Sequence, residues 1–341
     1  MKIGKKGLYI IFLSLILLFF VLLLEFSAKA FFWLSKSTDK LILTGDSRIY
    51  DNKPDIAFVN KYGIKVYYNS LGFIGKEIGD KHDDIFRILG VGDSVTAGTY
   101  LPQDQRYINR LGEILADKTN KRIEIINAGV GGYNTWQELE SIKGKGLSVN
   151  PDLIIVGVCL NDYINNKPKL KKSWFNMVIE NLRGGSKARY LDFLYQRSDL
   201  YKFLYDFFST GLRMRFGDAG YHRYLQNYNF EIKPEDFKNW KAAFTDMISL
   251  VKSHKKKILF TIFPLENQII NKEEDSYKPL SQFFKEEGIY YIDLIKDFKR
   301  EAKQSKILYM KRDIIHPTSI GHSIVAQAIS KYIIDNNILD N

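Results

Sequence analysis

A serine lies between glycines in the stretch Gly92-Asp93-Ser94-Val95-Thr96-Ala97-Gly98, directly after an apolar run. A serine hydroxyl is a weak nucleophile until a neighbouring base removes its proton. A tight turn at the end of a buried strand would expose the Ser94 hydroxyl, and the glycines would let a substrate come close to the backbone. Ser94 is therefore the candidate nucleophile, provided that the chain also supplies a base.

The tripeptide Gly-Asp-Ser occurs a second time, at Gly45-Asp46-Ser47. Arg48-Ile49-Tyr50 follow it, so the threonine and glycine of the first copy are missing. No pattern of a strand followed by a helix accompanies this copy. We interpret it as a coincidence.

The base and the group that orients it are predicted in Asp313-Ile314-Ile315-His316. A catalytic histidine needs an acceptor that fixes its tautomer and stabilises the imidazolium. An aspartate three residues earlier can reach the same ring. His322 is the rival base, but it falls inside the helix that begins at Pro317-Thr318. Of the 5 histidines, only His316 combines a close carboxylate with a strand-rich context.

Two further polar stretches could stabilise a negative charge on a reacting oxygen. Asn161-Asp162 follows one apolar run, and a side-chain amide at a strand end can donate to a developing oxyanion. The stretch from Asn127 to Gly132 follows another run, and a glycine there can offer its backbone N–H. The alternatives are that Asn161 only caps a loop and that Gly132 only forms a turn.

The elements that would position these residues are short apolar runs alternating with amphipathic stretches. This pattern predicts an α/β fold with a parallel sheet flanked by helices, whose active site lies at the carboxyl ends of the strands. We expect all four polar motifs at the ends of successive strands of this one sheet. The runs are Ile85–Val91, Ile123–Ile126, Leu153–Leu160, Lys257–Phe263 and Ile289–Ile292.

Helical spacing appears in two places. Tyr107, Leu111, Ile114 and Leu115 indicate a helix after the nucleophile motif. Near the C-terminus, a second helix is expected to hold the histidine loop against the sheet with one face formed by Ile320, Ile324, Ala328 and Tyr332. Earlier in the chain, Ala57–Val59 and Ile64–Tyr68 are strand-like.

The order of these motifs resembles that of the GDSL/SGNH hydrolase family over roughly residues 85–335. The layout is similar to that of membrane-anchored bacterial members, and this similarity includes the stretch from Asn69 to Phe73 ahead of the first core strand. The resemblance implies a three-layer α/β/α flavodoxin-like fold and an ester hydrolase that needs no metal and no cofactor. It implies that Ser94 is the nucleophile, His316 the base and Asp313 its orienter.

The resemblance also implies an oxyanion hole formed by the N–H groups of Ser94 and Gly132 and by the amide of Asn161. Gly132 is chosen over Gly129 and Gly131 by aligning the motifs. The chain departs from the family at Cys159, which stands where the family usually has glycine two residues before the asparagine. As the single cysteine, within an apolar run, Cys159 is expected to be buried.

The N-terminal segment predicts attachment to a membrane. Leu8 to Leu24 is almost entirely apolar, and Lys2, Lys5 and Lys6 precede it. A run of this length suits a single transmembrane helix, and the lysines would keep its start in the cytoplasm, with the catalytic part outside. The alternative is a signal peptide cleaved near Ala30, which would release a secreted protein.

The expected organisation is an anchor or signal segment over residues 1–34, an extension that packs on the catalytic domain over 35–84, and a hydrolase domain over 85–338. Within the domain, residues 168–238 are rich in aromatic and basic residues. This helical insertion forms either a lid or plain packing at one edge.

The net charge is +11, but the lysines are scattered and accompany no nucleic-acid module, so no nucleic-acid partner is expected.

The preferred function is a serine esterase that removes small acyl groups, such as O-acetyl, outside the cytoplasmic membrane. The substrate would be an acylated carbohydrate, with lipid esters second. Alternatives are an acyltransferase that modifies envelope polysaccharide and an inactive tethered binding protein. The oligomeric state is left open.

Overall fold

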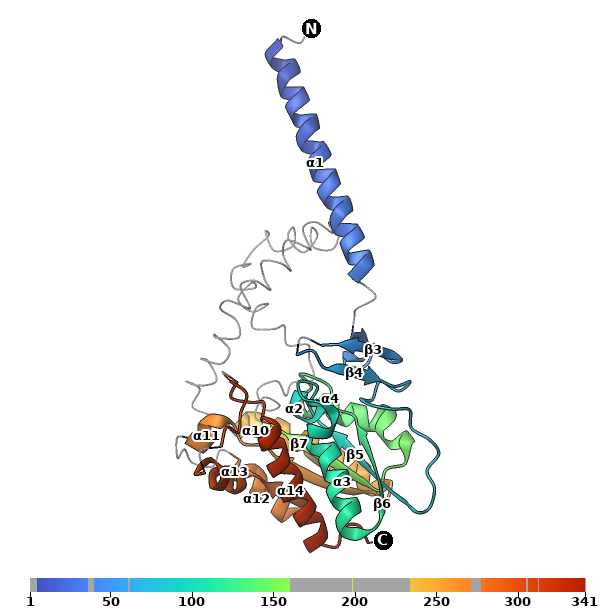
Figure 1. The fold of residues 1–341 in the computed structure, drawn as a ribbon, viewed down its shortest axis with the longest axis vertical. Coiled ribbons are helices and arrows are strands. Elements are labelled where there is room, and N and C mark those ends of the chain that lie inside the picture. The colour runs from blue at the N-terminus through green and yellow to red at the C-terminus, as the bar shows by residue number, and fades with distance from the viewer. Residues whose placement is uncertain are drawn as a thin grey trace. The chain divides into compact units, whose positions relative to one another are not determined.

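A computed structural model describes residues 5–35, 40–60, 62–159, 198, 234–270, 277–304, 306–311 and 313–340 (Figure 1). The chain divides into two compact units. The first comprises residues 1–39 and 172–223, and its described helix is α1 (Lys5–Ser35). The second comprises residues 40–171 and 224–341 and contains every other described element.

Five parallel strands form the centre of the second unit, in the order β6-β5-β7-β8-β9. Numbered along the chain, this is the order 2-1-3-4-5 of flavodoxin-like sheets. Each strand coincides with one of the predicted apolar runs to within two residues, so the predicted parallel α/β sheet is confirmed. The strands are β5 (Ile85–Val91), β6 (Arg122–Asn127), β7 (Leu153–Val158), β8 (Lys257–Ile262) and β9 (Tyr290–Asp293).

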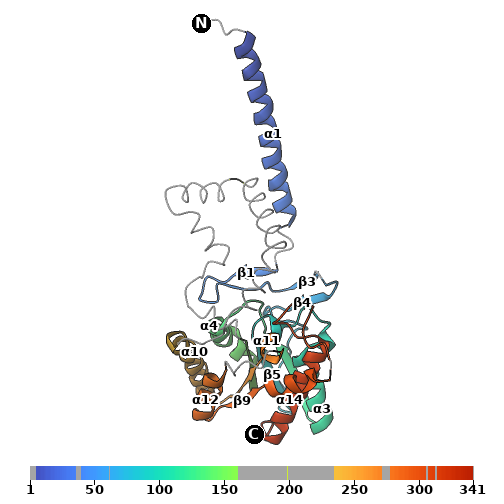
Figure 2. The same ribbon diagram turned by 90° about the vertical axis from the view of Figure 1, so that its left-hand side faces the viewer.

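Helices lie on both sides of this sheet, with α3 and α14 opposite α10 and α12 (Figure 2). Helix α14 contacts both α3 and α13, and α10 contacts α4 and β8. The strand β7 is buried along its whole length because helices cover both faces. The helices are α2 (Ser94–Ala97), α3 (Tyr107–Thr119), α4 (Thr135–Ser141), α10 (Pro234–Ser253), α11 (Glu266–Ile270), α12 (Lys278–Glu286), α13 (Ile295–Ala302) and α14 (Ser319–Asp335).

The predicted buried face of the last helix, α14, is wrong in part. Ile320 is 45% exposed, whereas Ile324 is buried as predicted. The helix packs against both α3 and α13, so it buries a wider arc than one stripe. The most deeply buried positions therefore run along another line, through His322, Val325, Ala326, Ile329 and Ile333.

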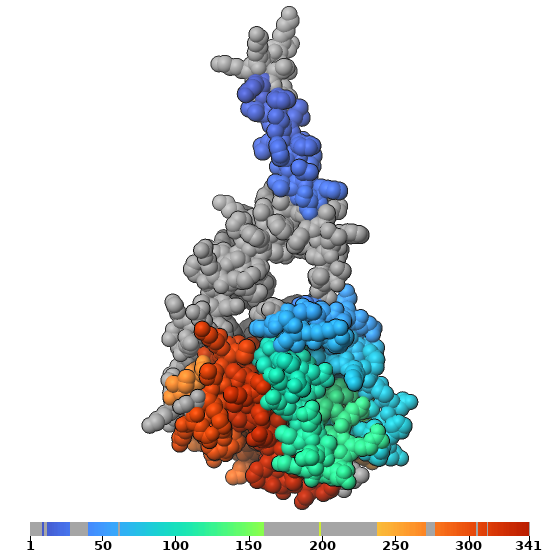
Figure 3. All heavy atoms as spheres, in the orientation of Figure 1, coloured from blue at the N-terminus to red at the C-terminus, as the bar shows by residue number. Residues whose placement is uncertain are grey.

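The extension before the main sheet forms two antiparallel hairpins. One pairs β1 (Leu41–Leu43) with β2 (Tyr50–Asn52), and the other pairs β3 (Ile56–Val59) with β4 (Lys65–Tyr68), where strands were expected. Figure 3 shows the light blue atoms of this extension directly against the teal atoms of the residues that follow it in the chain. The second Gly-Asp-Ser copy forms the turn between β1 and β2, where the Asp46 carboxylate accepts a hydrogen bond from the Arg48 N–H at 2.9 Å. No helix follows this copy, unlike Ser94.

Among the residues that the structure describes, no helix combines the length and apolarity that a membrane crossing requires. The predicted membrane anchor is not confirmed. The predicted oxyanion donor Asn161 lies outside the described residues. So do residues 168–233 of the predicted insertion, apart from Ser198. The last five residues of the insertion begin α10.

Candidate active site

The strand β5 delivers Ser94 to the carboxyl end of the sheet. The chain turns at Gly92 and Asp93, and Ser94 is the first residue of the single-turn helix α2. The Asp93 carboxylate caps this helix by accepting a hydrogen bond from the Val95 N–H at 2.8 Å. A Cβ atom at Gly92 would lie 2.2 Å from the Thr96 Oγ1, so only glycine fits this tight turn. Ser94 remains half-buried at the start of α2.

Ser94, His316 and Asp313 form one hydrogen-bonded chain of side chains. The Ser94 Oγ lies 2.8 Å from the His316 Nε2, although the two residues are 222 positions apart. The His316 Nδ1 lies 2.6 Å from the Asp313 Oδ2. When Nδ1 carries the proton and donates it to the carboxylate, Nε2 is left to accept from the serine hydroxyl. The structure thus brings together the three side chains that the sequence selected.

The Asp313 carboxylate is held by three N–H groups. Its Oδ1 accepts from the backbone N–H of Ile315 at 2.9 Å and from that of His316 at 3.0 Å, while its Oδ2 faces the imidazole. Burial by itself would raise the pKa of Asp313, but the hydrogen bonds and the charge of His316 outweigh it and lower the pKa. Asp313 is therefore ionised at neutral pH, as a partner for an imidazolium must be.

Behind His316, two buried side chains form a support that the sequence did not reveal. The Tyr100 ring packs edge-to-face on the His316 ring, with 5.0 Å between centroids. The Tyr100 hydroxyl lies 2.7 Å from the His322 Nε2, and the His322 Nδ1 accepts from the Tyr107 N–H at 2.9 Å. Burial lowers the pKa of His322 to about 3, so this ring is neutral and holds its position without carrying charge. No local pattern marks Tyr100, because its role depends on contacts across the fold.

Gly132 lies in a turn beside the nucleophile. The Val130 N–H donates to the Gly92 carbonyl at 3.0 Å, and the Tyr133 N–H closes the turn on the Val130 carbonyl at 3.2 Å. A Cβ atom at Gly129 would lie 2.3 Å from the Ala97 nitrogen, so this segment lies directly against α2. Gly132 has a φ of +80°, which glycine adopts without strain. Asn161, the other predicted donor, lies outside the described residues.

Two buried side chains, those of Cys159 and Glu138, lie near Asp93, and Glu138 was not predicted from the sequence. Cys159 is 2% exposed, as expected, with its sulfur 3.9 Å from the Asp93 Oδ1. Glu138 of α4 is fully buried, and neither of its oxygens has a hydrogen-bond partner. Burial, assisted by the negative charge of Asp93, raises the pKa of Glu138 well above its usual range. Glu138 is therefore a neutral acid in the folded chain.

Other candidate sites are few in the described part of the chain. No group of three or more His, Cys, Asp or Glu residues there could hold a metal ion. A surface cavity of about 340 Å³ lies at the amino ends of β5 and β7, the opposite end of the sheet from Ser94, and it is lined by residues such as His82, Asp84 and Asp152. None of the residues that line this cavity belongs to the Ser94–His316–Asp313 chain.

Residues 91–324 match the model of the GDSL-like lipase/acylhydrolase family. No curated protein matches the chain.

Similar solved structures have low sequence identity and low TM-scores. A lipolytic G-D-S-L family protein from Veillonella parvula is 12% identical with a TM-score of 0.42, covering 74% of this chain and 97% of that one. A variant of Axe2, an acetyl xylan esterase from Geobacillus stearothermophilus, is 15% identical with a TM-score of 0.43, covering 72% and 94%. A two-domain esterase active on acetylated mannans is 12% identical with a TM-score of 0.46, covering 74% and 49%. By the match over residues 91–324, the chain belongs to the GDSL-like lipase/acylhydrolase family and is an ester hydrolase.

Proposed function

We propose that the chain is a serine esterase in which Ser94 is the nucleophile, His316 the general base and Asp313 the group that orients His316. The observation that carries this proposal is the unbroken hydrogen-bonded chain from the Ser94 Oγ to the Asp313 Oδ2, at 2.8 Å and 2.6 Å. Its order of hydroxyl, imidazole and carboxylate is the one that serine hydrolases use on unrelated folds.

The proposed reaction proceeds through an acyl-enzyme. The Ser94 oxygen attacks the ester carbonyl while its proton passes to the His316 Nε2, and the imidazolium then protonates the leaving alcohol. Water, deprotonated by the same nitrogen, attacks the acyl-enzyme and releases the carboxylic acid. The lowered pKa of Asp313 supports this cycle, because an ionised carboxylate stabilises the imidazolium in both steps.

The tetrahedral intermediate carries a negative oxygen, and we propose three donors for it. These are the backbone N–H groups of Ser94 and Gly132 and the side-chain amide of Asn161. The position of the Gly132 turn, bonded to Gly92 through Val130, supports the second donor. Loss of one such donor typically lowers turnover by about 10²–10³-fold.

The proposed substrates are small acyl esters, such as O-acetyl groups, on envelope carbohydrate. The net charge of +11 supports an anionic polymer as the carrier. We further propose that the protein works outside the cytoplasmic membrane, held there by residues 1–34. This part of the proposal rests on the apolar run from Leu8 to Leu24 and the lysines before it.

The experiment compares p-nitrophenyl acetate and p-nitrophenyl octanoate as substrates for the full chain. Ser94→Ala should abolish turnover, whereas Ser47→Ala, in the second Gly-Asp-Ser copy, should leave it unchanged. A preference for acetate supports small acyl groups, and a preference for octanoate would move the proposal to lipid esters. Product analysis with an added sugar acceptor separates hydrolysis from acyl transfer. A full-length Ser94→Ala variant that stays active would overturn the mechanism.

Location is tested by cell fractionation of the full chain. Recovery in the membrane fraction, at the mass of the uncleaved chain, supports the anchor. A shortened product in the medium would replace the anchor with cleavage near Ala30.

A further inference from the structure

The turn that carries Gly132 has a central peptide that could rotate. Val130 to Tyr133 is closed by one hydrogen bond, and of its two central residues only Gly132 has a positive φ, at +80°. A positive φ at the second central residue alone is the pattern of a type II turn. A type I turn has nearly the same end points but the opposite orientation of the central peptide, as the φ and ψ values of the two types require. The two forms therefore direct the Gly132 N–H in opposite directions.

Little in the turn itself prevents this rotation. Both residues that flank the central peptide are glycines, which have no Cβ to restrict φ and ψ. A Cβ at Gly131 would meet nothing within 4 Å, so no packed neighbour holds that residue. The orientation of this peptide must come from a hydrogen bond to the rest of the protein.

Tyr50 supplies that hydrogen bond from the strand β2. Its hydroxyl donates to the Gly131 carbonyl at 3.0 Å. This carbonyl and the Gly132 N–H belong to the same trans peptide, so they point in opposite directions. A donor on the Gly131 carbonyl therefore fixes the Gly132 N–H on the far side of the peptide, and it also polarises that N–H as a donor.

The position of Tyr50 is fixed in turn by contacts across the fold. The Tyr133 hydroxyl donates to the Tyr50 carbonyl at 2.6 Å, and the two rings pack edge-to-face at 5.4 Å. The neighbouring carbonyl of Arg48 accepts from the Gln137 Nε2 at 2.7 Å. These bonds tie the turn and the second strand of the β1–β2 hairpin to the start of α4.

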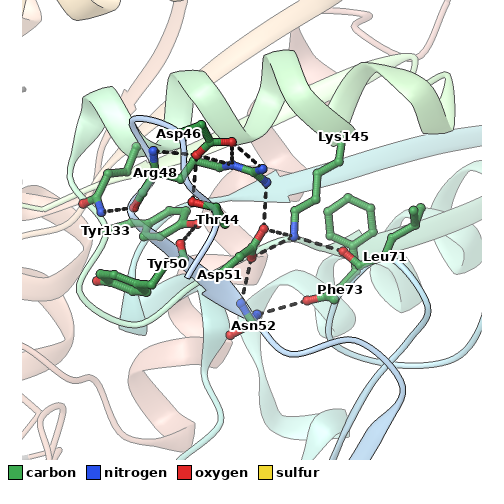
Figure 4. Close-up of polar contacts among 12 residues, drawn as sticks. Thr44, Asp46, Arg48, Tyr50, Asp51, Asn52, Leu71, Phe73, Tyr133 and Lys145 are labelled. Carbon is green, nitrogen blue, oxygen red and sulfur yellow. Dashed lines mark hydrogen bonds and ion pairs between the residues drawn. The ribbon is translucent and has the colours of Figure 1, made fainter. Parts of the chain in front are cut away.

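A group of ion pairs anchors the same hairpin (Figure 4). The Asp51 carboxylate lies 2.8 Å from the Arg48 guanidinium and 2.8 Å from the Lys145 ammonium, and Arg48 also pairs with Asp46 at 2.7 Å. The Lys145 ammonium donates to the Leu71 carbonyl at 3.1 Å. Asp51 and Lys145 are buried, so the pair that they form is shielded from solvent.

We propose that Tyr50 is a positioning residue for ester hydrolysis, which holds the Gly131–Gly132 peptide in the orientation that presents the Gly132 N–H to the oxyanion. This inference rests on the proposed function, in which Gly132 is an oxyanion donor. Burial, with the nearby charge of Asp93, raises the pKa of Tyr50 to about 12, so its hydroxyl stays a donor at every pH at which an esterase would work.

The test is Tyr50→Phe in the full chain, with Tyr67→Phe as the matched control. Tyr67 belongs to the same extension, but its side chain is exposed. Tyr50→Phe should lower kcat for p-nitrophenyl acetate by about tenfold, less than the loss of a whole donor, with KM within about twofold. Phenylboronic acid, which forms a tetrahedral adduct on serine, should bind weaker by the same factor as kcat/KM falls.

The outcomes separate this inference from the proposed function. If Ser94→Ala is inactive but Tyr50→Phe has the same kcat and the same affinity for the boronate as the parent, the role of Tyr50 alone is overturned. An increase in KM with unchanged kcat would also overturn it, because Tyr50 would then only contact the substrate. Activity in Ser94→Ala would overturn the proposed function itself. A melting temperature of Tyr50→Phe close to that of the parent excludes a merely structural loss.

Discussion

Replacing Asp313 with asparagine tests the proposed triad through the tautomer of one ring. The Asp313 Oδ1 accepts from two backbone N–H groups, at 2.9 Å and 3.0 Å. In Asp313→Asn the amide oxygen must remain on those donors, because the amide nitrogen cannot accept from them. The NH₂ group is then placed where the Oδ2 stood, 2.6 Å from the His316 Nδ1.

This arrangement moves the imidazole proton of His316 from Nδ1 to Nε2. The His316 Nδ1 must accept from the new amide, so Nε2 carries the hydrogen and faces Ser94 as a donor. A nitrogen that already carries a proton cannot take the one from the serine. We expect kcat to fall by about 10³–10⁴-fold, which is about 4–5.5 kcal/mol in activation free energy.

Asp313→Ala provides the comparison that isolates the tautomer. Alanine leaves the imidazole free to adopt either tautomer, so this variant should retain more activity than Asp313→Asn. It also removes the acceptor for two backbone N–H groups and should lose about 1–2 kcal/mol of stability. The assay is hydrolysis of p-nitrophenyl acetate, with Ser94→Ala as the inactive reference. Thermal melting of each variant measures its stability. A kcat of Asp313→Asn within about tenfold of the parent value would refute this account of the triad. A kcat of Asp313→Asn above that of Asp313→Ala would also refute it.

Two further predictions concern stability and pH. Burial lowers the pKa of His322 in the folded chain to about 3. Between about pH 3 and 6.5 the unfolded chain therefore binds more protons than the folded chain. As pH falls through that window, the free energy of unfolding should decrease by up to about 1.4 kcal/mol per pH unit. Melting between pH 7 and 5 should show this slope, and a His322→Gln variant with an equal slope would contradict it. The pKa of Glu138 is raised by burial, so the folded chain retains a proton that the unfolded chain releases above about pH 4.5. Glu138→Gln should therefore raise the melting temperature at pH 8, with a smaller gain at pH 5; a gain that does not depend on pH would count against a neutral Glu138.

The residues that could be predicted are those with a local signature. Ser94 stands in a Gly-Asp-Ser motif directly after an apolar run, whereas His316 was recognised by the carboxylate three residues before it. The last strand of the sheet, β9, ends at Asp293, so His316 does not directly follow a strand. The two residues, which are 222 positions apart, could be paired from the sequence because a serine nucleophile requires a base. The five strands were recognisable because each contains a short stretch that is mostly apolar.

The residues that escaped prediction act through contacts between distant segments. Tyr50 and Tyr100 are single tyrosines among 21, and nothing next to them in the sequence marks their partners. The hydroxyl of Tyr50 reaches a carbonyl 81 positions away. The α14 face was misjudged at Ile320 because a period of 3.6 residues shows that one side is apolar but not how wide an arc its neighbours cover.

The hairpin that carries Tyr50 also bears on where this enzyme could be shortened. A fragment that starts at residue 85 would keep every strand of the main sheet together with Ser94, Asp313 and His316. It would lack Tyr50 and also Asn52, whose side-chain amide donates to the Gly129 carbonyl at 3.2 Å. Such a fragment has the full inventory of acid–base groups but an unsupported Gly131–Gly132 peptide. By the proposed role of Tyr50, the smallest recombinant unit with full turnover begins before β1, at about residue 40, well upstream of β5, the first strand of the main sheet.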